Sequence, residues 1–422
     1  MTFRELIKEL EKNNELLKIK EAVSTNLEIA KILSNEKKAV LFENVKNSNY
    51  KVVGNLLSSE RMLRYLKLKE RQEFLKRISN AINNPSKPKI VERAPCHEVV
   101  IDDVNLYDLP ILLHTSKDMG PYITAGVFIA NDKEYGLNAS FHRATPIAKD
   151  KLVARICKRD LYTYLQRTKK DLNVAICIGL SPAILISAAI SVAINTNELE
   201  IANSIENFNL VKCKTSEILV PSESEIVLEG RITKEKHFEG PFLDITGTFD
   251  IIRKEPVIEI DLITHRKNPI YHAIVPSLKE HKFLMGTPRE VAMFNEINKV
   301  CRCEDVLLTE GGCSWLNGVV KIKKKNKDDG KKAIVRSFEA HKSLKHVVIV
   351  DDDIDIHNIN EVEWAIATRF QGKKENLVIK KELGSSLDPS ADENSMTVKI
   401  GIDATIPWNK KKEDFIKGRI GE

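Results

Sequence analysis

Apolar residues recur at helical spacing at the start of the chain. The apolar positions between Phe3 and Leu10 lie three or four residues apart, and Thr2 with Glu5 forms a capping-box pattern in front of them. This pattern predicts a helix over residues 3–13. A helix so placed would bury one apolar face and leave its charged residues in water.

The same start signal returns at Thr25 with Glu28, ahead of apolar residues at 29, 32 and 33. It predicts a second helix that is capped in the same way. Short apolar runs at 39–42 and 52–57 predict strands. Alternation of helix and strand is typical of an α/β unit.

Strands are predicted to dominate from about residue 99 to residue 300. The apolar runs lie at 127–130, 136–141, 152–157, 174–178, 226–228, 248–252, 257–262 and 270–275. Many short strands with few long helices are typical of a barrel or a sandwich. One long helix interrupts them, with Ser181 as N-cap, Pro182 at the first helical position and Ala183–Ile194 as its body.

The last third of the chain returns to alternation. The pattern predicts strands at 306–309, 318–321 and 346–350, a helix at 333–341, and a second helix at 361–370 that is capped by Asn360 with Glu363 and buries Trp364. Asp328-Asp329-Gly330, inside the lysine-rich run 321–332, is a turn signal. It predicts the solvated tip of a hairpin.

These patterns predict a mixed α/β (α+β) fold with three domains. A polar helix at about 68–83 leads into Asn84–Pro88, whose two prolines are typical of a linker. We therefore expect an N-terminal α/β domain over 1–105, a central β-barrel-like domain over 106–300 and a C-terminal α/β domain over 301–422.

Composition favours a soluble globular protein. The 422 residues are 42% hydrophobic and 30% charged, with a net charge of +6. The longest apolar run, 174–194, contains Ser181-Pro182 and lacks the flanks of a membrane span or a secretion signal. Aromatic residues are missing from the lysine-rich run, which argues against nucleic-acid binding. Seven cysteines without a secretion signal indicate reduced thiols, so we expect a cytoplasmic protein that contacts neither membrane nor nucleic acid.

Two motifs imitate metal sites without meeting their requirements. Cys301, Cys303 and Cys313 lack a zinc-site spacing and a nearby histidine. Asp351, Asp353 and Asp355 begin like a calcium loop, but glycine is missing at the sixth position and glutamate at the twelfth. Neither motif predicts a metal site.

The stretch Glu239-Gly240-Pro241-Phe242-Leu243-Asp244 is the strongest candidate for chemistry. Two carboxylates five positions apart would face opposite sides of a regular strand, but Gly-Pro between them forbids a regular ladder and lets both turn to one side. A buried pair of this kind can keep one member protonated as an acid. The alternative is a turn between strands with two surface acids.

Four further stretches complete a recognisable set. They are Asp118–Thr124, Leu137–Arg143, Val220–Gly230 and His341-Lys342. Together with Glu239–Asp244, and in this order over nearly the whole chain, they resemble the UbiD family of prenylated-FMN-dependent decarboxylases. The resemblance implies that the central domain is a split β-barrel that binds the flavin and a metal.

The resemblance also implies roles for single residues. Asn138 and Glu198 correspond to ligands of a manganese ion that bridges the flavin phosphate, with K⁺ as a further possible ion. The flavin is expected to contact Phe141, His142, Arg143, Arg155, Ile156, Cys157 and Lys342. The catalytic set is Arg143, Glu239 and Asp244. A third metal ligand, histidine in the family, is absent after the strand with Arg155, where Asp160 could supply an oxygen.

The implied activity is decarboxylation of an α,β-unsaturated acid, with Asp244 as proton donor and with Glu239 and Arg143 holding the substrate carboxylate. Asp at 244 and the segment Glu280–Glu290 are similar to the archaeal branch that converts trans-anhydromevalonate 5-phosphate to isopentenyl phosphate. Cations for such a phosphate stand at Lys279, His281, Lys282 and Arg289. Expected partners are this phosphorylated enoic acid, a flavin prenyltransferase that supplies the cofactor, and further copies of the chain. The alternatives are an aromatic acid such as 4-hydroxy-3-prenylbenzoate, and a non-catalytic flavin-binding protein.

Overall fold

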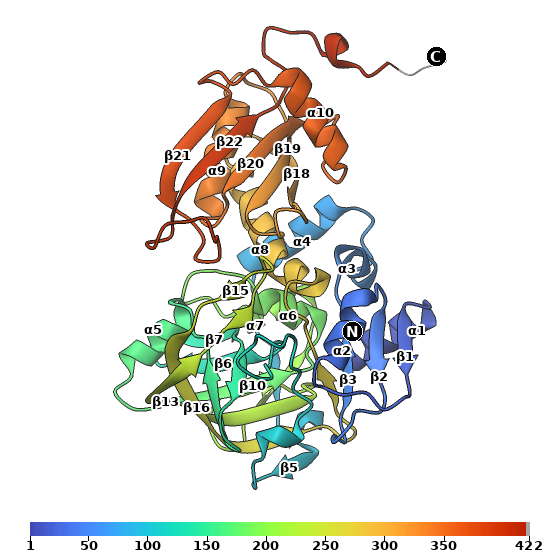
Figure 1. The fold of residues 1–422 in the computed structure, drawn as a ribbon, viewed down its shortest axis with the longest axis vertical. Helices are drawn as coiled ribbons and strands as arrows, with labels where there is room; N and C mark the ends of the chain where they lie inside the picture. Colours follow the sequence, from blue (N-terminus) through green and yellow to red (C-terminus); the bar gives the residue numbers. More distant parts are fainter. Residues whose placement is uncertain (419–422) are drawn as a thin grey trace. The chain divides into compact units, whose positions relative to one another are not determined.

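A computed structural model describes residues 1–418 as a mixed α/β protein, as predicted (Figure 1). The chain divides into two compact units. Unit 1 comprises residues 1–67 and 80–284, and unit 2 comprises residues 68–79 and those from 285 onward. The three-domain boundaries near residues 105 and 300 stay a prediction.

The N-terminal part of unit 1 is a small sheet with three helices. The elements are α1 (Phe3–Lys12), β1 (Leu16–Ile19), α2 (Glu28–Asn35), β2 (Ala39–Phe42), β3 (Lys51–Gly54) and α3 (Ser59–Tyr65). The sheet order is β1-β2-β3-β17, with β17 (Ile270–His272) added from much later in the chain. Both bonds of the predicted capping box at Thr2 and Glu5 are present, so this prediction is confirmed.

The second predicted capping box is wrong. Helix α2 begins at Glu28 with Leu27 as its N-cap, and no side chain caps it. Leu27 has a φ of 65° and donates its backbone N–H to the carbonyl of Leu113, so a contact distant in sequence fixes this helix start.

The main body of unit 1 is an eight-stranded sheet with the order β7-β6-β10-β13-β16-β9-β8, and β5 pairs with β16 (Figure 1). Its strands are β5 (Val99–Ile101), β6 (Val127–Asp132), β7 (Gly136–Phe141), β8 (Ala144–Pro146), β9 (Lys151–Ala154), β10 (Leu172–Ile178), β13 (Ile226–Glu239) and β16 (Arg253–His265). Side chains from this sheet, from the N-terminal sheet and from α5 share one buried core.

Strands β13 and β16 are far longer than the apolar runs that predicted them. They pair as antiparallel neighbours from Ile226 with His265 to Glu239 with Arg253, with two irregularities on the way. Their outer halves carry charged residues, because a strand that faces water on one side needs no apolar run. Glu239 therefore stands at the end of a long ladder that began inside the core.

The remaining elements of unit 1 are short. They are β4 (Lys89–Val91), α5 (Asp160–Arg167), α6 (Pro182–Ala188), α7 (Glu198–Ile205), β11 (Asn209–Lys212), β12 (Leu219–Pro221), β14 (Phe242–Leu243) and β15 (Phe249–Asp250). Helices α4 (Arg71–Asn83) and α8 (Lys279–Asn298) span the boundaries between the two units.

The long helix predicted from Ser181 to Ile194 is wrong. Helix α6 ends at Ala188, and the Ser181 side chain makes no capping hydrogen bond. Every residue of α6 is buried, so the run lacks the polar face that would reveal where the helix ends.

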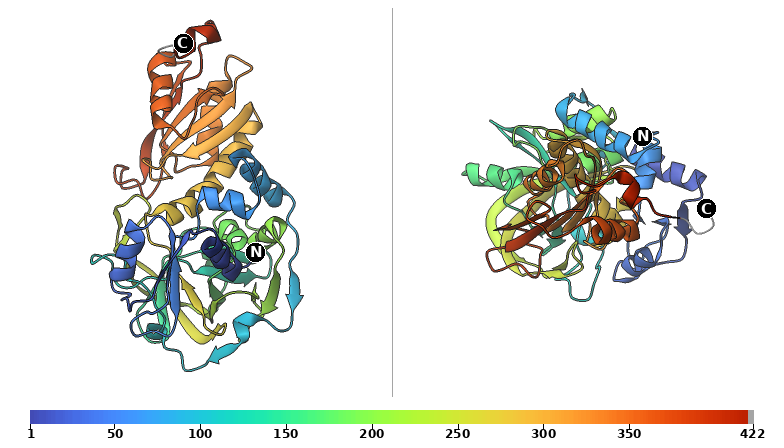
Figure 2. Two further views of the ribbon diagram at one scale, coloured as in Figure 1. Left: turned by 90° about the vertical axis from the view of Figure 1, so that its right-hand side faces the viewer. Right: turned by 90° about the horizontal axis from the view of Figure 1, so that it is seen from above.

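Unit 2 contains a five-stranded sheet with the order β18-β19-β20-β22-β21. Its elements are β18 (Arg302–Leu308), β19 (Asn317–Lys323), α9 (Asp329–Ala340), β20 (His346–Asp351), α10 (Ile359–Arg369), β21 (Leu377–Leu383) and β22 (Met396–Asp403). Helix α9 packs on the face that carries Gly401 and α10 on the face that carries Ile402 (Figure 2). Since neighbouring strand residues point to opposite faces, the sheet is covered on both sides.

The hairpin predicted at Asp328-Asp329-Gly330 is wrong. Strands β19 and β20 are parallel, so a crossover helix must connect them, and Asp328 is the N-cap of that helix. Asp329 accepts backbone hydrogen bonds from Lys325 and Asn326 at 2.8 and 2.9 Å.

The start of α10 also differs from the prediction. Asn358, rather than Asn360, is the N-cap, and Trp364 is only partly buried. Asp351 and Asp353 bind the buried Arg369 at 3.0 and 2.8 Å, so these aspartates serve an ion pair. Within residues 1–418, no helix combines the length and the apolar character needed to cross a membrane.

Candidate active site

Arg143 brings the two predicted acids together. It follows β7, and its Nε and Nη2 atoms donate to the two carboxylate oxygens of Glu239 at 2.8 and 3.1 Å. Glu239 is fully buried at the end of β13. This two-point contact fixes the plane of the guanidinium relative to the carboxylate.

Asp244 reaches the same guanidinium from the other side of the Gly-Pro turn. Its Oδ2 accepts from Nη1 of Arg143 at 2.8 Å. Gly240 has a φ of 91°, which favours glycine, and β14 then pairs with β15 in a short hairpin. The turn lets both acids face Arg143, as the sequence predicted, and the alternative of two surface acids is excluded.

Two further charged residues at this site were missed by the sequence analysis. Asp250 accepts from Nη2 of Arg143 at 2.7 Å, and Arg253 binds both oxygens of Asp250 at 2.6 and 2.9 Å. Asp250 lies in β15, directly opposite Phe242. The run 248–252 predicted a strand there, but nothing in its pattern indicated a partner so far away in sequence.

The Asp118–Thr124 stretch supports the acids from a second side. Tyr122 donates its hydroxyl to Glu239 at 3.0 Å, and Asp118 accepts from the backbone N–H of Leu243 at 3.0 Å. The ring of Phe242 lies under the guanidinium of Arg143, 4.6 Å from its carbon to the ring centroid. These contacts hold the hairpin against the arginine.

The charged groups at the site shift one another's pKa values. Burial disfavours the charged form of Arg143, yet Glu239 and the other two carboxylates outweigh it and raise the Arg143 pKa. Burial also acts against the charge on Asp250, but hydrogen bonds from Arg253 and the charge of Arg143 lower its pKa to about 2. Three carboxylates thus face two guanidinium groups.

Two histidines lie close to this cluster. Burial lowers the pKa of His281, although the charge of Asp244 opposes the effect, and its Nδ1 accepts from the backbone of Ser277 at 3.0 Å. Burial lowers the pKa of His114 to about 3. Its ring stands edge-on to Phe242 at 6.3 Å, and neither ring nitrogen finds a partner among the described residues.

Asn138 and Glu198, the predicted metal ligands, are adjacent and buried. The amide of Asn138 donates to Glu198 at 3.2 Å, and the backbone N–H of Ala139 donates to the other carboxylate oxygen at 3.0 Å. Burial, with a smaller contribution from the charge of Asp160, raises the pKa of Glu198 to about 8.

This donor set fits a hard divalent cation. No cationic side chain pairs with Glu198 among residues 1–418, and Asp160 is near enough to influence its charge. A cation would supply the missing positive charge and would find carboxylate and amide oxygens, the donors that hard cations prefer.

The predicted flavin-contact segments lie side by side. The backbone N–H of Arg155 donates to the carbonyl of Arg143 at 3.0 Å, and His142 donates from Nδ1 to the carbonyl of Arg155 at 3.1 Å. Burial lowers the pKa of His142 to about 4, so its ring is neutral near pH 7.

The strand predicted over 152–157 ends early. Strand β9 ends at Ala154, and Arg155 pairs with the buried Glu255, which also accepts from the backbone N–H of Ile156 at 3.3 Å. Phe141 is partly buried and Cys157 is exposed. Lys342 is an exposed residue of unit 2, after α9.

The four cations predicted for a substrate phosphate belong to different units. Lys279, His281 and Lys282 stand on the first turn of α8 in unit 1. Arg289 belongs to unit 2, where its guanidinium lies over the ring of Trp315 at 5.6 Å.

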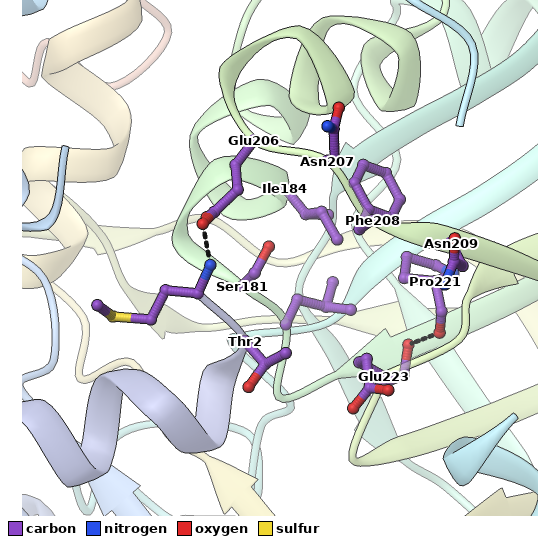
Figure 3. Close-up of a pocket in the computed structure, with 12 residues that line it drawn as sticks. Thr2, Ser181, Ile184, Glu206, Asn207, Phe208, Asn209, Pro221 and Glu223 are labelled. Atoms are coloured by element: carbon purple, nitrogen blue, oxygen red, sulfur yellow. Dashed lines mark hydrogen bonds and ion pairs between the residues drawn. The ribbon is translucent and has the colours of Figure 1, made fainter. Parts of the chain in front are cut away.

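A separate pocket lies beside the start of the chain (Figure 3). Its lining includes Met1, Ser181, Ile184, Phe208 and Glu223, and the terminal amine of Met1 pairs with Glu206. Burial raises the pKa of Glu206 to about 7. None of the predicted site residues lines this pocket.

Comparison with protein families gives three adjacent matches. Residues 7–82, 89–279 and 282–404 match the N-terminal, Rift-related and C-terminal domains of the UbiD model, described as 3-octaprenyl-4-hydroxybenzoate carboxy-lyase. Together these matches span almost the whole chain.

Curated relatives and solved structures match along the full length. The chain is 42% identical over 428 residues to the anhydromevalonate phosphate decarboxylase of Methanosarcina mazei, covering 100% of both chains. It is 41% identical to the same enzyme of Methanothermobacter thermautotrophicus, covering 93% and 94%. The UbiD-class enzyme HmfF from Pelotomaculum thermopropionicum, in complex with FMN, is 34% identical with a TM-score of 0.95, covering 100% of this chain and 98% of that one. A second HmfF structure, an evolved dimeric form in complex with prFMN, has 32% identity, a TM-score of 0.91 and coverage of 99% and 98%.

Proposed function

The chain belongs to the UbiD family, and from this premise we propose that it decarboxylates trans-anhydromevalonate 5-phosphate to isopentenyl phosphate with prenylated FMN. One observation carries the proposal. Glu239 and Asp244 share the guanidinium of Arg143 in a chain that matches relatives named anhydromevalonate phosphate decarboxylase along its full length.

The cofactor supplies the difficult part of the chemistry. Prenylated FMN, when bound, provides the electron sink that makes loss of carbon dioxide from an α,β-unsaturated acid feasible. The segments 141–143 and 155–157 would line it. Asn138 and Glu198 would hold Mn²⁺, with Asp160 in place of the family histidine and K⁺ as an additional ion.

Arg143 and Glu239 orient the substrate. Glu239 accepts from Arg143 twice and from Tyr122 once, and it is fully buried, so its carboxylate is fixed in place. A guanidinium held in this way presents its remaining N–H, on Nη1, in a fixed direction toward a substrate carboxylate.

Asp244 is better placed than Glu239 to donate a proton. One of its oxygens binds Arg143, and the other accepts from the backbone N–H of Ile245, at 2.6 Å, as its one partner within residues 1–418. Its side chain is 14% exposed, whereas Glu239 is enclosed. A general acid must regain its proton after each turnover, and Asp244 has access to solvent for that step.

The phosphate of the substrate would be bound by cations on α8. Lys282 is partly buried and follows His281 in the sequence. The charge of Asp244 acts on the pKa of His281. The charge of Lys282 also acts on His281, which supports Lys282 as the phosphate ligand, because a charge-assisted hydrogen bond to phosphate would be strong there.

We also propose that a flavin prenyltransferase supplies the cofactor, that the chain forms homo-oligomers, and that it works in the cytoplasm. The dimeric HmfF form supports the second point for this class of enzyme.

The test is to produce the protein together with a flavin prenyltransferase, record its absorption spectrum and measure carbon dioxide release. Anhydromevalonate phosphate should be decarboxylated, and 4-hydroxy-3-prenylbenzoate should not. Turnover of the aromatic acid alone would replace the proposed substrate. A flavin spectrum without turnover of either acid would favour a non-catalytic flavin-binding protein.

A further inference from the structure

Asp250 makes the third carboxylate contact to Arg143, and it has no role in the proposed reaction so far. Its Oδ2 lies 2.7 Å from Nη2 of Arg143, and its side chain is only 8% exposed. The hairpin of β14 and β15 carries both Asp250 and Asp244, so one small element contacts two ends of the same guanidinium.

The hydrogen-bonding capacity of Asp250 is already used. Oδ2 accepts from Arg143 and from Arg253, and Oδ1 accepts from Arg253 and from the backbone N–H of Ile251. A carboxylate with about four acceptor sites has none left for a substrate. The same contacts keep it ionised, in agreement with its lowered pKa. Asp250 therefore acts through Arg143 and not on a ligand.

The contacts of Arg143 can be counted in the same way. A guanidinium on an arginine side chain has five N–H groups. Nε donates to Glu239, Nη2 donates to Glu239 and Asp250, and Nη1 donates to Asp244. Among partners in the described part of the chain, this leaves one hydrogen, on the same Nη1 atom that binds Asp244.

We propose that Asp250, clamped by Arg253, is a positioning residue that locks the Arg143 guanidinium so that its remaining Nη1 hydrogen and Asp244 face the substrate together. The inference rests on the proposed function, in which Arg143 holds the substrate carboxylate. Without Asp250, Nη2 loses its second partner, and the remaining contacts to Glu239 and Asp244 oppose rotation of the guanidinium about its Nε–Cζ bond less strongly. A misplacement of about 1 Å costs about a hundredfold in rate.

Arg253 strengthens the lock from the opposite side. Its two nitrogens bind both oxygens of Asp250, which fixes the carboxylate plane, and its side chain is 22% exposed. Arg253 makes this contact from the first position of β16, beside Glu239 in the ladder. The contacts from Arg253 to Asp250 and from Asp250 to Arg143 thus connect the start of β16 to a residue two positions after β7.

The decisive experiment observes Arg143 itself by nuclear magnetic resonance of arginine-labelled, full-length protein loaded with flavin and with Mg²⁺, a hard diamagnetic ion that replaces the paramagnetic Mn²⁺. The Nε–H signal is assigned by its loss in Arg143→Lys. We expect separate, slowly exchanging Nη signals in the wild type. In Asp250→Asn and in Arg253→Gln, rotation about Nε–Cζ should be at least tenfold faster, and these signals should merge.

A matched control carries the same charge change on the neighbouring strand β16. Asp261 pairs with Arg231 at 2.6 Å, so Asp261→Asn also removes an ion pair from this strand. In Asp261→Asn, the Nη signals of Arg143 should exchange at the same rate as in the wild type. Unchanged Arg143 signals in Asp250→Asn, or equal changes in Asp261→Asn, would overturn the proposal even if activity were lost.

Activity provides the second measurement. Asp250→Asn should lower kcat/KM by about ten- to a hundredfold with flavin and manganese content retained. Because Arg253 acts only through Asp250, adding Arg253→Gln should cause no further loss. Additive losses would overturn the proposal. If Asp250→Asn does not fold, Arg253→Gln decides by the same signals, because the Arg253 side chain is more exposed than that of Asp250, 22% against 8%.

The two proposals fail in different ways. A wild-type protein that decarboxylates no enoic acid, but shows the expected Arg143 signals and their loss in Asp250→Asn, would refute the proposed function and support the positioning role.

Discussion

Nη1 of Arg143 lies 2.8 Å from Oδ2 of Asp244, while Nε of the same side chain lies 2.8 Å from Oε1 of Glu239. The arginine therefore contacts both acids through different nitrogens and lies between them. Of the two, only Asp244 has an exposed side-chain fraction, 14%, by which it can exchange protons with water. We therefore propose that Glu239 orients Arg143 and that Asp244 donates the proton.

The first prediction concerns the metal. Glu198→Ala should lower both manganese and flavin content in purified protein, because the loss of one ligand loosens the others. Content is measured by elemental analysis and by flavin absorbance. Glu200→Ala is the matched control, since Glu200 stands in the first turn of the same helix and is partly exposed. Full retention of manganese by Glu198→Ala would refute the assignment.

Asp160 requires a separate test. Asp160→Ala should reduce manganese content if its carboxylate replaces the family histidine, because a hard cation loses an oxygen ligand. Unchanged manganese content would show that another group completes the site.

The next prediction concerns the substrate phosphate. Loss of a charge-assisted hydrogen bond costs about 1.5–3 kcal/mol, which is about a ten- to hundredfold loss in kcat/KM. Lys282→Gln should therefore impair turnover of anhydromevalonate phosphate and leave any turnover of the dephosphorylated acid unchanged. Lys299→Gln, an exposed lysine just after α8, is the control. Equal rates on both acids in the wild type would remove the phosphate argument.

The acid limb of the stability curve should depend on Asp250. Its pKa is about 2 in the folded protein, below the ordinary value of 3.8, because hydrogen bonds from Arg253 and the charge of Arg143 outweigh burial. Ionised Asp250 thus stabilises the fold above about pH 4, and this stabilisation is lost as pH falls towards 2. The contribution is at most about 2 kcal/mol.

Urea unfolding at pH 4.5 and pH 2.5 measures this effect. The difference between the two midpoints should be smaller in Asp250→Asn than in the wild type, while Asp261→Asn should behave like the wild type. An unchanged difference in Asp250→Asn would mean that other carboxylates account for the acid sensitivity.

Local chemistry made some of these features predictable. The capping box at Thr2 uses residues three apart, and the apolar spacing that follows it needs no distant partner. The pairing of Glu239 and Asp244 was predictable for a similar reason, since glycine and proline between them exclude a regular strand.

Features that depend on distant partners were not predictable. Leu27 starts α2 because its N–H meets Leu113. The turn signal at Asp328-Asp329-Gly330 predicted a hairpin. Strands β19 and β20 pair in parallel instead, and parallel neighbours need a crossover connection such as a helix. Asp250 meets Arg143 across 107 positions of sequence, through a hairpin whose strands have two residues each.

The last prediction concerns the proton donor. Asp244→Asn keeps the shape of the side chain and can still accept from Arg143, but it has no acidic proton to donate. The variant should therefore fold, retain manganese and flavin, and lose most of its turnover. General acid catalysis is worth about a hundred- to ten-thousandfold, which sets the expected loss in kcat.

Glu239→Gln distinguishes an orienting acid from the donor. It should also lower activity, but it should do so by releasing Arg143. Its effect should therefore be strongly non-additive with that of Arg143→Ala in a double-mutant cycle. Loss of a proton donor should lower activity whether or not Arg143 is in place. Carbon dioxide release under saturating substrate measures kcat for each variant. If Asp244→Asn retains more than about a tenth of wild-type kcat, short of the range for general acid catalysis, the donor is another group. Glu239 is then the first group to test. Its carboxylate also binds Arg143, through the Nε and Nη2 atoms.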